Sequence, residues 1–207
     1  MEIFSLALLL LFGLHLLKSR ERAARVALLG SFLARYQIEK LMESLTDGYL
    51  RALGEQDAQR RTQIWDLLAT TEKNLALQLQ SFADDFGRVP ADEARVSTLA
   101  IALPYAIRWF PAATFDMREM LQLHARGIAA VVAQAPGGEE GMAQERKRQA
   151  YTVTAELYLL QHSCHWFCRS ATVASVRLIA LHQTSYEQVL EGVSPATRAA
   201  YRQLAGV

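Results

Sequence analysis

Reactive side chains are concentrated in one segment of the chain, residues 161–169, which reads QHSCHWFCR. The segment holds two imidazoles, two thiols and a guanidinium, the groups that bind metals, transfer protons and hold anions in proteins. Apolar residues recur around it every three or four positions, which predicts a helix. The chemistry open to the segment therefore depends on which of these groups share a helical face.

At about 100° per residue, a helix places the histidines and the cysteines on different faces. One stripe combines two tyrosines, both histidines and the arginine: Tyr151, Tyr158, His162, His165 and Arg169. The other combines apolar residues and both thiols: Val153, Leu157, Leu160, Cys164, Cys168 and Ala171. Because the ligands of a zinc ion converge to about 2.0–2.3 Å, one straight helix cannot offer all four of its histidines and cysteines to a single metal.

The histidine stripe has two interpretations. In the first, Tyr158, His162, His165 and Arg169 line a ligand pocket with His124 facing them from a preceding helix, and the chain is a helical-bundle enzyme or a cofactor- or metal-binding protein. In the second, the same groups are buried and satisfy one another or the carboxylates of a neighbouring helix, because buried polar groups need partners. We expect the second arrangement.

Motifs of known reaction types are missing from the sequence. It contains no Glu-x-x-His pair of a di-iron bundle, no His-Glu-x-x-His, no Gly-x-Ser-x-Gly and no glycine-rich phosphate loop. A c-type haem attachment site reads Cys-x-x-Cys-His. Here Cys164-His165 matches its end, but Gln161 occupies the position of the first cysteine. We therefore expect no catalytic residue, no metal and no cofactor, and we expect both cysteines to be reduced core residues.

Composition points to a globular chain without affinity for nucleic acid. The 207 residues are 51% hydrophobic and 21% charged, which is enough apolar material for a core. The formal net charge is only +1, so no global excess of positive charge would attract a nucleic acid.

Residues 3–17 form the most apolar segment, IFSLALLLLFGLHLL, and Lys18 and Arg20 follow it. At 1.5 Å per residue the segment spans about 22 Å of helix, less than the roughly 30 Å of a hydrocarbon core. A signal peptide would begin with basic residues and end with small ones, which this segment does not. Since basic flanks can snorkel and a bilayer can thin, we expect residues 1–22 to be a single-pass membrane anchor with its flank, rather than a buried or oligomerising helix.

Basic residues follow the apolar segment within one or two helical turns: Lys18, Arg20, Arg22 and Arg25. Basic residues this close to a span tend to remain in the cytoplasm. The pattern predicts an inner-membrane (plasma-membrane) protein whose N-terminus lies outside and whose residues 23–207 form a cytoplasmic domain. Its expected partners are membrane lipid, through residues 3–17, and a protein or a second copy of the chain.

The rest of the sequence reads as helices separated by glycine and proline, which predicts an all-α fold. Apolar spacing and capping residues give a bundle of about four main helices and a short last one: up to Gly54, from Asp57 to Phe86, about 112–134, about 139–192, and from Ser194-Pro195 to Leu204. The first and fourth are unusually long, so we expect a kink or a break in either of them, for example at Gly30 or near Ser170. Residues 135–138, Ala-Pro-Gly-Gly, are the strongest turn signal. No segment alternates as a strand does, so no sheet is expected.

One segment, Leu99 to Phe110, lacks a clear period and reads LAIALPYAIRWF. We expect a connection that crosses the core, because most apolar runs are buried. The alternatives are an exposed patch for a partner protein, or a second membrane contact with Tyr105, Trp109 and Phe110 at the level of the lipid headgroups.

The anchor and the lack of catalytic motifs together predict a function. We expect a membrane-anchored cytoplasmic helical domain that acts by binding a protein, as a scaffold, adaptor or assembly factor. The enzyme or cofactor-binding bundle built on the histidine stripe is the alternative.

Overall fold

The computed structural model describes residues 2–100, 103–134 and 142–206, and its regular structure is almost entirely helical, as predicted. The longer helices are α1 (Glu2–Leu33), α2 (Ile38–Gly54), α3 (Ala58–Phe86), α6 (Met117–Ala133), α7 (Met142–Cys168), α8 (Ala171–His182), α9 (Tyr186–Gly192) and α10 (Pro195–Ala205). Two single-turn helices, α4 (Ala91–Ala94) and α5 (Ala106–Trp109), and two strands, β1 (Arg95–Ser97) and β2 (Thr114–Asp116), lie between α3 and α6.

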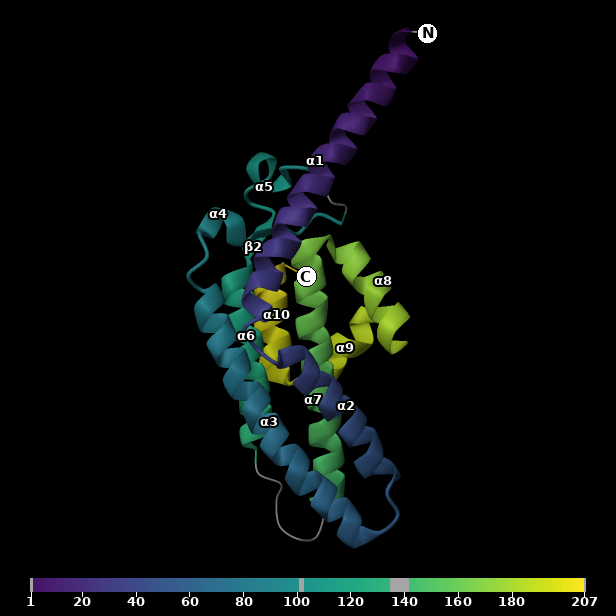
Figure 1. The fold of residues 1–207 in the computed structure, drawn as a ribbon, viewed down its shortest axis with the longest axis vertical. Coiled ribbons are helices and arrows are strands. Elements are labelled where there is room, and N and C mark those ends of the chain that lie inside the picture. Colours follow the sequence, from purple (N-terminus) through teal and green to yellow (C-terminus); the bar gives the residue numbers. More distant parts are fainter. Residues whose placement is uncertain (1, 101–102, 135–141, 207) are drawn as a thin grey trace.

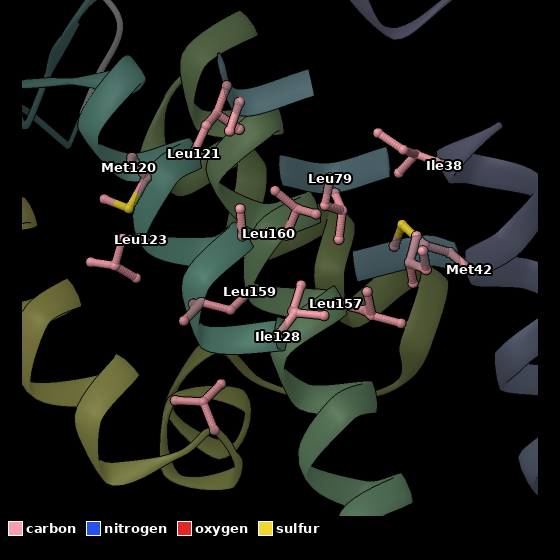
Figure 2. Packing of buried hydrophobic residues seen from close by; sticks show 14 of the residues in the cluster. Ile38, Met42, Leu79, Met120, Leu121, Leu123, Ile128, Leu157, Leu159 and Leu160 are labelled. Atoms are coloured by element: carbon pink, nitrogen blue, oxygen red, sulfur yellow. The ribbon is translucent and has the colours of Figure 1, made fainter. Parts of the chain in front are cut away.

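Helix α7 runs through the middle of the bundle, with α3 and α6 on one side and α8 and α9 on the other (Figure 1). Its leucines Leu157, Leu159 and Leu160 are almost completely buried. Figure 2 shows them among apolar side chains of α2, α3 and α6, including Met42, Leu79 and Ile128. Because α7 is covered from several directions, the stripe that holds the cysteines lies largely inside the protein, whereas in the histidine stripe His162 is buried and Tyr151 and Arg169, near its two ends, are exposed.

Capping residues fix the predicted starts of α3 and α10. The carboxylate of Asp57 accepts from the backbone N–H of Arg60 at 2.8 Å. The hydroxyl of Ser194 accepts from the backbone N–H of Thr197 at 3.2 Å, with Pro195 in the first helical position. Each cap satisfies an N–H group that has no partner within its own helix, and both predictions are confirmed.

The two long predicted helices are broken, as expected, but the positions differ in part. The fourth predicted helix, about 139–192, divides at Ser170, which confirms that break. The hydroxyl of Ser170 caps α8 by accepting from the N–H of Val173. The same predicted helix divides again at Gln183, which has a left-handed backbone (φ 52°) and was not predicted as a break. The first predicted helix, up to Gly54, is broken between Leu33, where α1 ends, and Ile38, where α2 begins, rather than at Gly30.

The expectation that the chain has no sheet is wrong for one short antiparallel ladder. Strands β1 and β2 pair Val96 with Phe115 over three residues each, too few for alternation to be visible in the sequence. The ladder is held against α7, because the indole N–H of Trp166 donates to the carbonyl oxygen of Ser97 at 2.9 Å. The Phe115 ring also meets the Trp166 ring edge-on at 5.0 Å.

The ladder closes the irregular segment into a loop that lies at the surface. Of its described residues, Ala106 is buried, whereas Leu103, Tyr105, Trp109 and Phe110 are exposed, Trp109 to 75%. The prediction of a connection that crosses the core is therefore wrong for most of this segment. Residues 101–102 and the predicted turn at residues 135–138 lie outside the described residues.

The first half of α1 extends beyond the bundle as a single helical rod (Figure 1). Contacts with other elements hold its second half, where Leu29 is buried and Arg25 donates to the carbonyl oxygen of Phe167 at 3.1 Å. Measured over the described residues, none of the helices is both long enough and apolar enough to cross a membrane. The division of the chain at residue 22 stays a prediction.

Two glycines make a matched test of the packing between α6 and α10. A methyl group at Gly127 would lie 2.4 Å from Oγ1 of the buried Thr197 and 3.2 Å from Oε2 of Glu156, whereas one at Gly30 would meet nothing within 4 Å. We expect Gly127→Ala to lower the free energy of unfolding by about 1–3 kcal/mol through overpacking. Gly30→Ala should raise it by about 0.5–1 kcal/mol through helix propensity. Urea denaturation measures both, and a Gly127→Ala variant as stable as Gly30→Ala would contradict this close approach.

Candidate functional site

The histidine stripe of α7 is divided among several environments. The ring of Tyr158 stacks on His182 of α8, with centroids 3.7 Å apart and planes 18° apart. His162 is buried among α8, α9 and α10, and His165 is half-buried with its pKa lowered mainly by burial. Arg169 is exposed, just after the end of α7. These residues therefore do not line one common pocket.

His162 is part of a buried polar network. With its proton on Nε2, the ring donates to Oγ of Ser175 at 3.1 Å, and its Nδ1 accepts a long hydrogen bond from the Tyr201 hydroxyl at 3.5 Å. Its face stacks on the ring of Tyr186, with centroids 4.6 Å apart. One side chain of α7 thus joins three helices that follow it in the sequence.

His124 of α6 also lies beside Tyr201, at a ring distance of 5.9 Å. Its Nε2 lies 2.8 Å from Oγ of Ser163, which itself donates to the carbonyl oxygen of Leu159. Ser163 must therefore accept from the histidine, which places the proton of His124 on Nε2. The remaining nitrogen, Nδ1, is a buried acceptor without a hydrogen-bond partner among the described residues.

Burial keeps both imidazoles neutral. It lowers the pKa of His124 to about 3, with a smaller effect from His162, and it lowers the pKa of His162 to about 4, ahead of the effect of His165. A charged imidazolium would lose its hydration there, and for His162 the opposing attraction of Glu187 is the smaller effect. The structure thus brings His124 and His162, both predicted as site residues, next to one tyrosine, Tyr201, as neutral hydrogen-bonding groups.

This network has few means of performing chemistry. In the part of the chain that the structure describes, no group of three or more histidine, cysteine, aspartate or glutamate side chains is placed to hold a metal. The thiols lie on the other stripe, and burial raises the pKa of Cys164 to about 12, so its reactive thiolate is disfavoured. What the arrangement does is join α6, α7, α8, α9 and α10 through polar contacts inside the bundle.

Sequence reasoning missed the tyrosines of this network. Tyr186 and Tyr201 belong to α9 and α10, and nothing in their local sequence separates them from ordinary core tyrosines. The sequence position of Ser163 could have identified it as a member of the network. It is a small polar residue in an apolar helical segment, four positions after the buried Leu159. A buried helical serine of this kind needs a partner, and its own turn supplies only an acceptor.

A second candidate site is the end of the molecule from which α1 extends. Large apolar side chains are exposed there on all sides of the helix, with exposed fractions from 75% at Phe4 to 39% at Leu17. They are Phe4, Leu6, Leu8, Leu9, Leu10, Leu11, Phe12, Leu14, Leu16 and Leu17. A helix that packs on a protein core has one apolar face, whereas one that is apolar all round belongs in an apolar surrounding.

The exposed aromatic loop around α5 lies at the same end, beside α1 (Figure 1). It is tied to that helix, because Oε2 of Glu21 accepts from the backbone N–H of Tyr105 at 3.2 Å. Tyr105, Trp109 and Phe110 are all exposed. Aromatic residues thus gather near the point where the apolar part of α1 leaves the bundle.

Comparisons of the chain with protein-family models, with curated proteins and with solved structures gave no match.

The buried histidines generate a prediction about acid stability. Below the ordinary histidine pKa of 6.5, His124 and His162 become protonated in the unfolded chain but stay neutral in the folded protein, because burial lowers their pKa values. Each histidine therefore lowers the free energy of unfolding by up to about 1.4 kcal/mol per pH unit as the pH falls. Above that pH neither contributes to the pH dependence. His124→Gln keeps a donor for Ser163 and removes the titration, so it should flatten this fall between about pH 6 and 4.

Urea denaturation at a series of pH values measures the effect, and the double variant with His162→Gln should be flatter still. The pKa values of the buried carboxyls Glu72 and Glu156 are raised by burial, which opposes the fall, but they are present in every variant and cancel in the comparison. A His124→Gln variant with the slope of the parent chain would show that His124 is protonated in the folded protein.

Proposed function

We propose that residues 3–17 insert into a membrane and hold the helical bundle at its surface, where the bundle acts by binding a protein. The observation that carries the proposal is the exposure of large apolar side chains on every side of the extended part of α1. Leucine and phenylalanine each contribute about −0.3 to −0.6 kcal/mol to insertion near mid-membrane, so ten of them favour the bilayer by on the order of 5 kcal/mol.

Lipid suits this surface better than a protein partner does. Leu8, Leu9, Leu10 and Leu11 are consecutive, so they point in four directions around the helix, and all are more than half exposed. A partner helix or groove would cover one side and leave the rest in water. Hydrocarbon chains surround a helix completely.

The loop around α5 supplies a second contact in this proposal. Tryptophan and tyrosine are enriched at membrane interfaces because their rings are apolar and their N–H or O–H groups remain hydrated. Trp109 and Tyr105 are exposed, and the backbone N–H of Tyr105 is bonded to Glu21 of α1, near the end that would face the lipid. Lys18 and Arg20 follow the apolar segment and would lie at the headgroups, with the bundle on the cytoplasmic side.

Protein binding is the activity proposed for the bundle itself. It is supported by α8, which exposes Val176, Ile179 and Leu181 by more than half, a group of apolar residues typical of interaction surfaces. An enzyme built on the histidine stripe would need access to His124 and His162, and both rings are buried. The buried network therefore favours binding over catalysis.

Membrane attachment is tested with paired aspartate substitutions in the full-length chain. Leu9→Asp with Phe12→Asp places two charges in the extended part of α1, at a cost of about 3 kcal/mol each in a membrane. The control, Leu67→Asp with Leu77→Asp, changes two α3 leucines that are exposed to 74% and 70%. We expect only the α1 pair to lose flotation with phosphatidylcholine vesicles, with melting temperatures close to the parent for both. An α1 pair that still floats, or that unfolds, contradicts the anchor.

Orientation is tested by reporters fused after the last residue of the chain. Because Lys18, Arg20 and Arg22 follow the apolar segment, a reporter active only in the cytoplasm should work and one active only outside should not. Replacing these three residues by glutamine should weaken the preference. The opposite reporter pattern in the parent chain would reverse the proposed topology.

A further inference from the structure

A cavity of about 340 Å³ lies where α1 joins the bundle. Its walls come from α1, from the segment between β1 and α5, and from the junction of α7 and α8. Neither the exposed apolar helix nor the buried histidine network explains this space, and its volume is within the range of small-molecule sites.

Three cations of α1 line the cavity together. Lys18, Arg22 and Arg25 are spaced by four and three residues, so they lie on one face of the helix. Arg169 contributes a fourth cation from the opposite wall. Glu21 is the carboxylate among the lining residues, and the described part of the cavity therefore has a formal charge of three positive.

Among the residues that the structure describes, only one of these cations has a carboxylate partner. Arg25 pairs with Glu21 at 3.3 Å and donates to the carbonyl oxygen of Phe167. Lys18, Arg22 and Arg169 have no carboxylate within ion-pair distance among the residues described. In addition, α8 begins beside Arg169 on the same wall, and the start of a twelve-residue helix carries a partial positive charge. The charge of the cavity therefore favours an anionic ligand, which none of the described side chains supplies.

Much of the remaining lining is apolar. Leu99, Leu103 and Ile107 come from the loop, and Val173 comes from α8. A fully hydrated anion gains nothing from such walls, whereas an anion attached to hydrocarbon gains from both the charge and the apolar contact. The combination favours an amphiphile with a phosphate group.

The cavity also lies at the right depth for such a ligand. Lys18 comes directly after the apolar segment, and Arg22 lies about 6 Å further along the helix axis, at 1.5 Å per residue. The headgroup layer of a bilayer is roughly 5–8 Å thick on each side of its hydrocarbon core. If residues 3–17 are inserted, these cations lie at the level of lipid phosphates.

We propose that this cavity binds the headgroup of an anionic phospholipid, with Lys18, Arg22 and Arg169 around the phosphate and the loop leucines against the first carbons of the lipid. The inference rests on the proposed function, because membrane insertion is what brings a lipid to the cavity. It goes further in naming a specific lipid class and the residues that select it.

Native mass spectrometry of the full-length chain, released from a neutral detergent, tests the site without requiring insertion into a bilayer. The probes are phosphatidylglycerol, phosphatidylcholine and inorganic phosphate. We expect one phosphatidylglycerol per chain, bound at least tenfold more tightly than phosphatidylcholine, and no displacement by millimolar phosphate. Equal binding of the two lipids, or displacement by phosphate, would overturn the proposal.

Paired charge removal locates the binding. Arg22→Gln with Arg169→Gln removes two cavity cations, and at about fivefold per cation it should weaken phosphatidylglycerol binding by roughly 25-fold. Arg20→Gln with Arg108→Gln removes two exposed cations at the same end that do not line the cavity, and should change binding less than about threefold. Equal losses in both pairs would mean general attraction to positive charge and would refute a site.

The two proposals fail separately in these experiments. A chain that floats with phosphatidylcholine vesicles but does not prefer phosphatidylglycerol in detergent has an anchor and no headgroup site. A chain that prefers phosphatidylglycerol in detergent but does not float has the site and no anchor.

Discussion

The structure depends on the enclosure of α7 by the helices around it. Because this helix has neighbours in several directions, its polar residues cannot all point to water, and several of them bond to later parts of the chain. Glu156 is fully buried and accepts from the backbone N–H of Ser194 at 3.1 Å, so it helps to hold the start of α10. His162 helps to hold α8 and α10 against α7, through its hydrogen bonds with Ser175 and Tyr201. Polar residues that an isolated helix would expose therefore specify how the last three helices pack.

Local signals in the sequence were sufficient for the helices whose ends are capped by their own residues. Asp57, Ser170 and Ser194 each lie next to the N–H groups that they satisfy, so the signal and its effect are a few residues apart. The end of α1 has a different cause. Residues 34–37, Ala-Arg-Tyr-Gln, include neither glycine nor proline, and the chain turns there where Tyr36 donates to Asp85 and the N–H of Gln37 donates to Gln78 of α3. Contacts with a distant helix decide such a break, and no local pattern contains them.

The residues of the candidate sites were also predictable only where the signal is local in the sequence. His124 and His162 were identified because histidines are few and their helical positions follow from spacing, and the structure places both in one network. Tyr186 and Tyr201 were not, because only the packing of α9 and α10 on α7 brings them there. The loop from Leu99 to Phe110 was expected to be buried from its composition, yet the ladder at its base directs most of its described apolar residues outward.

The continuity of α1 has a mechanical consequence. Its 32 residues form one helix of about 48 Å, with Leu29 packed in the core at one end and the exposed apolar segment at the other. Since the helix is continuous between the two parts, the orientation of the apolar segment and the orientation of the bundle are rigidly coupled. If the apolar segment is inserted as proposed, a change in bilayer thickness that tilts it would swing the whole bundle by a similar angle. The bundle would then present α8 at a height and direction set by the lipid around α1, so that the membrane itself would control which partners can reach that surface.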